Sequence, residues 1–133
     1  MNETTLNEAS TAVQNFLQSM EARDLDRAKT FLAPGFTMEF PGSQTFTSLD
    51  DLVHWSGERY RAVRKHYDCF DALADDGAII VYCWGTLSGE WLDGVPFSDI
   101  RFIDRFVVRD SRFESQKVWN DIADVQRPSQ LND

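Results

Sequence analysis

The periodicity of apolar residues changes near the middle of the sequence, and this change constrains the fold more than any other feature. In roughly the first half, apolar residues recur mainly at helical spacing, whereas in the second half they alternate with polar residues along long segments. A group of helices followed by a group of strands is typical of α+β proteins, in which helices cover one face of a sheet. We therefore expect an α+β fold with three N-terminal helices packed on a curved, mostly antiparallel sheet.

Two helices are predicted at the N-terminal end. Thr5 and Glu8 have the spacing of a capping box, and apolar residues follow at helical spacing as far as Met20. Asp24 is placed to cap a second, shorter helix, and Pro34-Gly35 is placed to end it. The sequence thus predicts a helical hairpin over residues 5–33.

A short strand and a third helix are predicted next. Residues 36–40 alternate between apolar and polar side chains, as a half-buried strand does. Ser48, with Asp51 three residues later, marks the start of the third helix, whose apolar side continues in helical spacing to Val63.

Four antiparallel strands are predicted after the third helix. Asp75-Asp76-Gly77 and Asp110-Ser111 are typical turn residues between them. The predicted strands are 66–74, 78–87, 97–109 and 112–122. A length of 133 residues suits one domain, which we assign to residues 1–125, and residues 126–133 are expected to form a flexible tail.

Charge and composition narrow the possible partners. The formal net charge of −9 would repel nucleic-acid phosphates and anionic membranes, and no run of about 18 apolar residues occurs. We therefore expect no nucleic-acid partner, no membrane partner and a cytoplasmic location. Ten Phe and four Trp are more than a core of this size usually holds, so some are expected to line a cavity or an interface.

The sequence lacks the common motifs for nucleotide binding, metal binding and nucleophilic hydrolysis. The chain has no Gly-rich phosphate loop, no Cys or His pair at metal-ligand spacing and no Gly-x-Ser-x-Gly motif. We expect neither a cofactor nor a metal. An Asp/Glu/His metal site stays open, although His54 and His66 are twelve residues apart.

Asp104 does not match the other residues of its predicted strand face. Alternate residues of the segment 97–109 form an apolar set, and Asp104 stands in the middle of it, between Phe102 and Phe106. A buried carboxylate must be paired, hydrogen-bonded or protonated. Two interpretations follow: Asp104 is a proton-transfer group with a raised pKa, or it is a structural carboxylate bonded to a neighbour.

Other candidate residues carry weaker signals. His66, at the start of a predicted strand, would make an acid–base pair beside a carboxylate, but a His in this position is more often a surface or satisfied core residue. Tyr82 and Trp84 share one face of the next strand and suit either a pocket wall or ordinary core packing. Trp119 in the last strand is a candidate dimer contact.

Three segments resemble one known superfamily. They are Ala22-Arg23-Asp24-Leu25-Asp26, Phe31-Leu32-Ala33-Pro34-Gly35-Phe36 and Ile103-Asp104-Arg105-Phe106. Together with the order of elements over residues 5–125, they resemble the nuclear transport factor two-like superfamily, particularly its SnoaL-like and steroid delta-isomerase-like proteins. The resemblance implies a cone-shaped pocket between helices and sheet, and a homodimer. This fold hosts isomerases, dehydratases, cyclases, epoxide hydrolases and binding modules, so it does not define the activity.

The catalytic patterns of the superfamily match only in part. At the positions of the steroid isomerase Tyr and general-base Asp, this chain has Phe16 and Phe40, and only Asp104 matches. Steroid isomerisation of that type is therefore not expected, because Phe40 cannot remove a proton. The inward positions of the epoxide hydrolase pattern correspond to Tyr82, Trp84 and Val118, which do not match it.

The resemblance and Asp104 together lead to one functional hypothesis. We expect a SnoaL-like enzyme that performs cofactor-independent acid–base chemistry, of the isomerase, cyclase or dehydratase type, on an apolar or aromatic metabolite in a buried pocket. Asp104 would be the general acid or oxyanion donor and His66 its partner base. The expected substrate-binding residues are Phe16, Phe40, Tyr82, Trp84, Phe102 and Asn120. The alternative is a non-catalytic ligand-binding or dimeric assembly domain.

Overall fold

The computed structural model describes residues 5–125 of the chain, so the tail expected at residues 126–133 lies outside the described residues. Four helices and six strands occur in this part. Their order is α1 (Leu6–Glu21), α2 (Leu25–Lys29), β1 (Leu32–Phe40), β2 (Gln44–Phe46), α3 (Leu49–Gly57), β3 (Tyr60–Asp75), β4 (Ala78–Trp91), β5 (Pro96–Arg109), β6 (Arg112–Asn120) and α4 (Ile122–Val125). None of the helices within residues 5–125 has the length and apolar character needed to cross a membrane.

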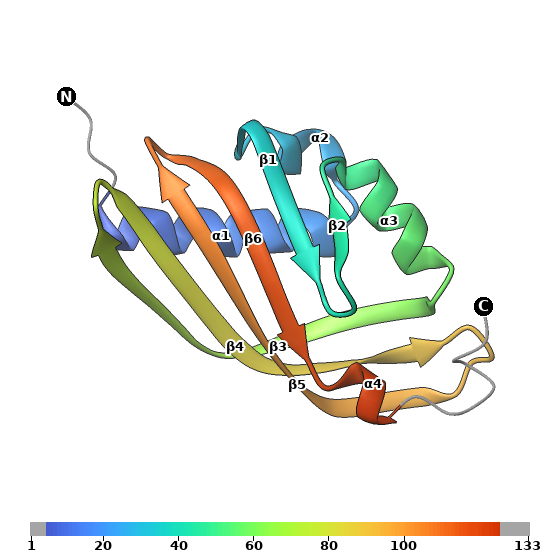
Figure 1. Cartoon of the computed structure of the whole chain (residues 1–133). Coiled ribbons are helices and arrows are strands. Elements are labelled where there is room, and N and C mark those ends of the chain that lie inside the picture. The colour runs from blue at the N-terminus through green and yellow to red at the C-terminus, as the bar shows by residue number, and fades with distance from the viewer. Residues whose placement is uncertain (1–4, 126–133) are drawn as a thin grey trace.

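The six strands form one curved, open sheet in the order β2-β1-β6-β5-β4-β3. Neighbouring strands are antiparallel except for β1 and β6, which are parallel. Helix α1 lies across one face of the sheet, and α2 and α3 stand beside β1 and β2 (Figure 1). The expected α+β architecture is confirmed, with the addition of α4 after the sheet.

Two glycines of β4 allow the sheet to bend where β3 passes closest to it. A Cβ atom on Gly85 would lie 1.9 Å from the carbonyl oxygen of His66, and one on Gly89 would lie 2.0 Å from that of Ala62. The pairing of β3 with β4 also shifts register between Tyr67 and Cys69, as at a bulge. Bulges and strand glycines bend a sheet, so the long strands β3 and β4 curve around the helical side (Figure 1).

The predicted helix starts are present. The Glu8 amide donates to Thr5 Oγ1 at 3.1 Å, and the Thr5 amide donates to Glu8 Oε1 at 3.2 Å, which completes the capping box of α1. Asp24 caps α2 by accepting a hydrogen bond from the Arg27 amide.

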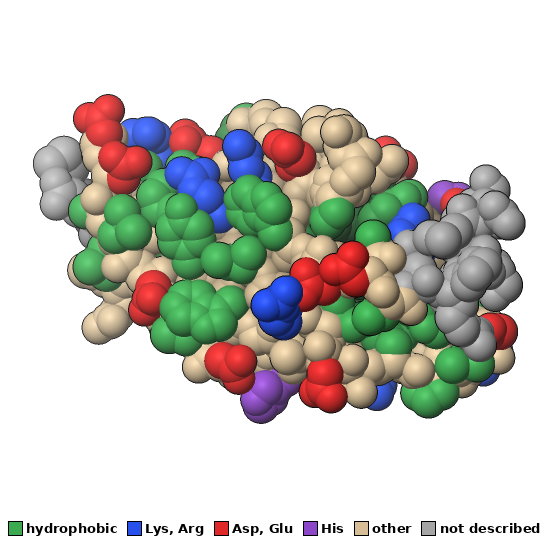
Figure 2. Space-filling view, turned by 60° about the horizontal axis from the view of Figure 1, so that its bottom comes forward, with side chains coloured by type: hydrophobic (Ala, Val, Ile, Leu, Met, Phe, Trp, Pro, Cys, Tyr) green, Lys and Arg blue, Asp and Glu red, His purple; other side chains and the backbone are tan. Residues whose placement is uncertain are grey.

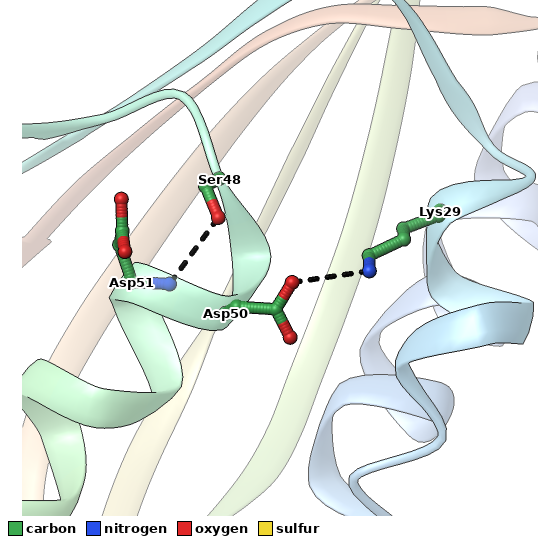
Figure 3. A network of polar contacts seen from close by, with 4 residues as sticks. All are labelled: Lys29, Ser48, Asp50 and Asp51. Carbon is green, nitrogen blue, oxygen red and sulfur yellow. Dashed lines mark hydrogen bonds and ion pairs between the residues drawn. The ribbon is translucent and has the colours of Figure 1, made fainter.

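Helix α3 is anchored at its first turn. Ser48 Oγ accepts a hydrogen bond from the Asp51 amide at 3.3 Å, as the sequence predicts for a helix start. Lys29 of α2 forms an ion pair with Asp50 of α3 at 3.1 Å, so these two helices are linked beside the sheet (Figure 3).

Several predicted boundaries are wrong: β1 begins at Leu32 rather than at residue 36, and β4 continues to Trp91 rather than ending at residue 87. Helix α2 ends at Lys29, and Pro34-Gly35 lies inside β1, where Gly35 has a φ of +82° and the pairing with β6 is irregular. Helix α3 ends at Gly57, and Tyr60 and Val63 belong to β3. A register shift between Tyr60 and Ala62 leaves Tyr60 and Val63 three positions apart on the inner side of β3, which imitates helical spacing.

Part of the core fills the half of the molecule between α1 and the strands β1, β6 and β5. Phe16 of α1 is buried and meets four other phenylalanine rings at centroid distances of 5.3–6.5 Å, all in edge-to-face geometry. These rings are Phe31, Phe36, Phe106 and Phe113. This half is closed by aromatic packing, which leaves the other half for a cavity.

Candidate functional site

A cavity of about 400 Å³ lies between the end of α1, the α3 helix, α4 and the inner face of the sheet. Its volume falls in the range of small-molecule sites. Most of its wall is apolar or aromatic. The lining residues central to its chemistry are Phe40, Trp55, Arg59, Lys65, Tyr67 and Phe102.

Lys65 and Asp104 form a buried pair beside this cavity. Asp104 is fully buried on β5, as predicted from its place among the alternate apolar residues of the segment 97–109. Its Oδ2 atom accepts a hydrogen bond from Lys65 Nζ at 2.5 Å, and Lys65, on β3, lines the cavity with a side chain that is 20% exposed. Asp104 does not line the cavity itself, so its carboxyl group meets the cavity through the lysine.

The second carboxyl oxygen of Asp104 has an apolar environment. Oδ1 is buried without a hydrogen-bond partner among the described residues, and the Cys83 thiol stands 4.0 Å from Oδ2. Burial raises the pKa of Asp104, while the Lys65 ammonium acts in the opposite direction. The carboxyl is therefore easier to protonate than an exposed Asp.

The pKa values of two further side chains are shifted near this buried pair. Burial, followed by the charges of Cys83, Asp104 and Glu21, raises the pKa of the Tyr67 phenol far above neutral pH. Burial and Asp104 likewise raise the pKa of the Cys83 thiol to about 12. Both groups are consequently neutral at physiological pH, and Tyr67, which lines the cavity, keeps its O–H donor.

The structure does not bring His66 to Asp104. The His66 imidazole is 79% exposed and lies 3.5 Å from Asp68, outside the cavity lining. The reason is strand parity, because the neighbouring Lys65 points inward and His66 therefore points outward. The place that the sequence suggested for a histidine beside Asp104 is occupied by Lys65.

Three of the six expected substrate-binding residues line the cavity, and three do not. Phe40, Phe102 and Asn120 are in its wall. Phe16 lies in the core behind the wall. Tyr82 and Trp84 occupy the positions of β4 that alternate with its buried inner residues, and the Tyr82 hydroxyl accepts a hydrogen bond from Arg105 at 3.3 Å. Their strand therefore points them to the outer face of the sheet.

Several cavity residues were missed from the sequence. Lys65 and Tyr67 alternate with His66 on β3, so parity places them on the face opposite His66, but the sequence alone does not say which of the two faces is the inner one. Trp55 of α3 and Arg59, just after this helix, could not be identified from the sequence. They line the cavity because of the path that the chain takes around the end of α3, which no local pattern predicts. Within residues 5–125, no three His, Cys, Asp or Glu side chains are grouped so that they could hold a metal ion.

Comparison with known proteins shows the fold. No family model matches the sequence, and no curated protein matches it. Among solved structures, an NTF2-like protein of unknown function from Burkholderia pseudomallei superposes with a TM-score of 0.72 at 16% identity, over 94% of this chain and 98% of that one. The chain therefore has the NTF2-like fold, which is the fold that the resemblance seen in the sequence implies.

Two other solved structures share this fold. A protein described as a SnoaL-like polyketide cyclase, from Jannaschia, has a TM-score of 0.66 at 14% identity, over 94% of both chains. TerC, co-crystallised with polyporic acid, has a TM-score of 0.68 at 15% identity, over 87% of this chain and 93% of that one. At this level of identity the likeness is one of fold.

Proposed function

We propose that this chain is a small-molecule enzyme that performs cofactor-independent acid–base chemistry on an apolar or aromatic metabolite held in the cavity. The observation that carries the proposal is the contact between the cavity-lining Lys65 and the buried Asp104. Perturbed acid–base groups at the wall of an apolar cavity are typical of catalytic sites. Two proteins with the same fold, one described as a polyketide cyclase and one co-crystallised with polyporic acid, support a small organic molecule as the occupant.

The proposed roles follow from which residues line the cavity. In the proposed mechanism Asp104, whose pKa burial raises, holds the proton of the pair, and the Lys65 amine takes a proton from a carbon next to a substrate carbonyl. The Tyr67 phenol, which stays protonated, donates a hydrogen bond to the enolate oxygen that forms. Asp104 acts through Lys65 as a positioning residue, and return of the proton from Lys65 to another carbon or to oxygen completes an isomerisation or cyclisation.

An exchange experiment tests this chemistry without knowledge of the natural substrate. The protein is incubated in D₂O with 2-acetylnaphthalene, an aromatic ketone, and deuterium uptake into its methyl group is followed by NMR. We expect faster uptake than in buffer, and a loss of about 100-fold or more of this acceleration in Lys65→Gln. Arg64→Gln, on the outer side of the same strand, is the matched control. Uptake at the buffer rate, or equal uptake by a folded Lys65→Gln, would refute the proposal.

A non-catalytic ligand-binding or dimeric assembly domain is the second candidate. Two observations favour it: Asp104 does not line the cavity, and Phe40 stands in the wall where a catalytic carboxylate would be useful. This candidate predicts that 2-acetylnaphthalene binds but gains no deuterium. The same experiment therefore separates the two functions.

The homodimer and the cytoplasmic location stay predictions. Figure 2 shows apolar side chains gathered on the sheet face turned away from α1, a surface that suits a second copy of the chain. Cys69 and Cys83 are both free thiols, as in proteins of reducing compartments, which suits the cytoplasm.

A further inference from the structure

Arg59 lies two residues after the end of α3 and lines the cavity with a half-buried side chain. Its guanidinium lies over the Trp55 ring, 4.7 Å from the centroid, and 5.8 Å from the centroid of the Tyr60 ring. Its Nε atom also donates to the Tyr60 hydroxyl at 3.5 Å. Two aromatic rings thus hold the guanidinium against the wall, while stacking leaves the N–H groups at its edge available for a ligand.

The charge of Arg59 has no carboxylate partner among the residues that the structure describes. Other arginines of the strands do have one, such as Arg101 with Asp121 and Arg109 with Glu114. Lys65, the other half-buried cation of the cavity, has Asp104. Because a guanidinium keeps its charge at any physiological pH, half-burying it without a counter-ion is unfavourable unless something else supplies the negative charge.

The cavity differs in charge from the rest of the chain. The formal net charge of the protein is −9, yet three cations, Arg23, Arg59 and Lys65, line the cavity against one carboxylate, Glu21. Glu21 is exposed at the end of α1. Arg23 donates to the Met20 carbonyl and is exposed as well, so Arg59 is the cation that the cavity wall best positions.

We propose that the ligand of this cavity is an aromatic carboxylic acid, and that Arg59 binds its carboxylate in a charge-assisted, two-point hydrogen bond. This inference rests on the proposed function for the cavity and adds the chemical class of the occupant. The aromatic body lies against Phe40 and Trp55, and the carboxylate lies at the edge of the Arg59 guanidinium. The ligand supplies the counter-ion that the protein lacks there.

The experiment compares two probes that share one aromatic body. Binding of 2-naphthoic acid, which is ionised at neutral pH, and of neutral 2-acetylnaphthalene is measured by isothermal titration calorimetry. We expect the acid to bind at least about tenfold more tightly, as a charge-assisted hydrogen bond to a partly buried guanidinium provides. Added salt is expected to weaken binding of the acid and leave the ketone unaffected.

Two variants test whether Arg59 causes the preference for the acid over the ketone. Arg59→Gln is expected to lose about tenfold or more in affinity for the acid and to keep its affinity for the ketone. Arg64→Gln removes the same charge from an exposed position outside the cavity, and is expected to bind both probes like the wild type. Circular dichroism confirms that both variants are folded.

Each other outcome is decisive. Equal affinity for both probes, or an equal loss of both in Arg59→Gln, overturns the carboxylate inference. Such results leave the proposed acid–base function intact if deuterium exchange into the ketone is still accelerated. If neither probe binds, the inference is overturned together with the aromatic occupant of the cavity. If both bind as expected but no exchange occurs, the inference holds and the catalytic proposal fails.

Discussion

Lys65 on β3 places its ammonium 2.5 Å from the carboxyl of Asp104 on β5, so the two side chains meet across the intervening strand β4. Asp104 is fully buried, and Lys65 lies between it and the cavity. The ammonium of Lys65 consequently supplies the partner that the buried carboxyl of Asp104 needs. Whatever binds in the cavity meets the lysine, with the carboxyl behind it.

The first prediction concerns the stability of this pair. Lys65→Met leaves a buried carboxylate without its partner, which is expected to destabilise the protein by about 3–5 kcal/mol at neutral pH. Lys65→Met/Asp104→Leu removes both charges and is expected to be close to the wild type or more stable. Urea unfolding of the three proteins provides the measurement. If Lys65→Met were as stable as the wild type, the carboxyl of Asp104 would have to be protonated or hydrated in that variant.

The pH dependence of Lys65→Met has a definite sign. Burial raises the pKa of Asp104, and without Lys65 nothing opposes this effect. A carboxyl with a raised folded-state pKa binds its proton more tightly when folded, so its contribution to stability is present below the unfolded pKa and is lost as pH rises through the folded pKa. The deficit relative to the wild type should therefore be smaller at about pH 5 than at about pH 7.5.

The second prediction isolates the Tyr67 hydroxyl. Tyr67→Phe keeps the ring, which contacts Phe70 at 5.0 Å and Phe102 at 5.8 Å between centroids, and removes only the O–H donor. If this donor stabilises the enolate, ketone exchange should fall by about 100-fold while the thermal midpoint changes little. Tyr82→Phe, on the outer face, serves as the control. An unchanged exchange rate in Tyr67→Phe would remove Tyr67 from the mechanism.

The third prediction separates the core from the cavity wall. Phe16→Ala should cost about 3–5 kcal/mol of unfolding free energy, because it empties the centre of the phenylalanine cluster. Phe40→Ala, at the half-buried cavity wall, should cost less stability and weaken binding of 2-acetylnaphthalene more. Chemical denaturation and calorimetry measure the two effects. The reverse pattern would place the ligand in the phenylalanine cluster.

Sequence patterns predicted the fold well because its signals are local. The capping box at Thr5 and Glu8 and the turn at Asp76-Gly77 use residues that are close in sequence, and both are present, with φ values of +49° and +81° at the turn. The predicted end of the third helix was wrong because a register shift in β3 gives Tyr60 and Val63 the spacing of helical residues. The strand β2 is only three residues long and gave no usable pattern.

The site was predictable only in part because it depends on how distant strands meet. The parity of β5 placed Asp104 on the inner face correctly. Its partner could not be identified from one strand alone, since Lys65 and His66 are adjacent and point to opposite faces. The phase of β3 is set by its bulge and by α3, which no local pattern encodes.

The fourth prediction uses the two thiols. Cys83 is buried and its pKa is raised to about 12, whereas Cys69 is partly exposed. Only the thiolate reacts with a disulfide reagent, so the native protein at about pH 8 should expose at most one readily reacting thiol. Cys69→Ser should react only after unfolding, as followed by absorbance of the released chromophore. Rapid reaction of native Cys69→Ser would mean that the interior around Asp104 opens readily.

The last prediction concerns the outer sheet face. Register places Trp84, Ile103 and Trp119 in one row across β4, β5 and β6, and Trp119 is 48% exposed. An apolar row of this kind is costly to leave in water, and a second copy of the chain would cover it.

We therefore expect a dimer by light scattering at micromolar concentration, and a monomer for Trp119→Glu, because the two copies would bring like charges together. Leu92→Glu adds the same charge to an equally exposed residue in the loop after β4 and should remain dimeric. A wild-type monomer would count against this interface, and a dimer that survives Trp119→Glu would place the contact on another surface. Since the row lies on the face opposite α1, association there leaves the cavity mouth open, and probe affinities should not depend on protein concentration.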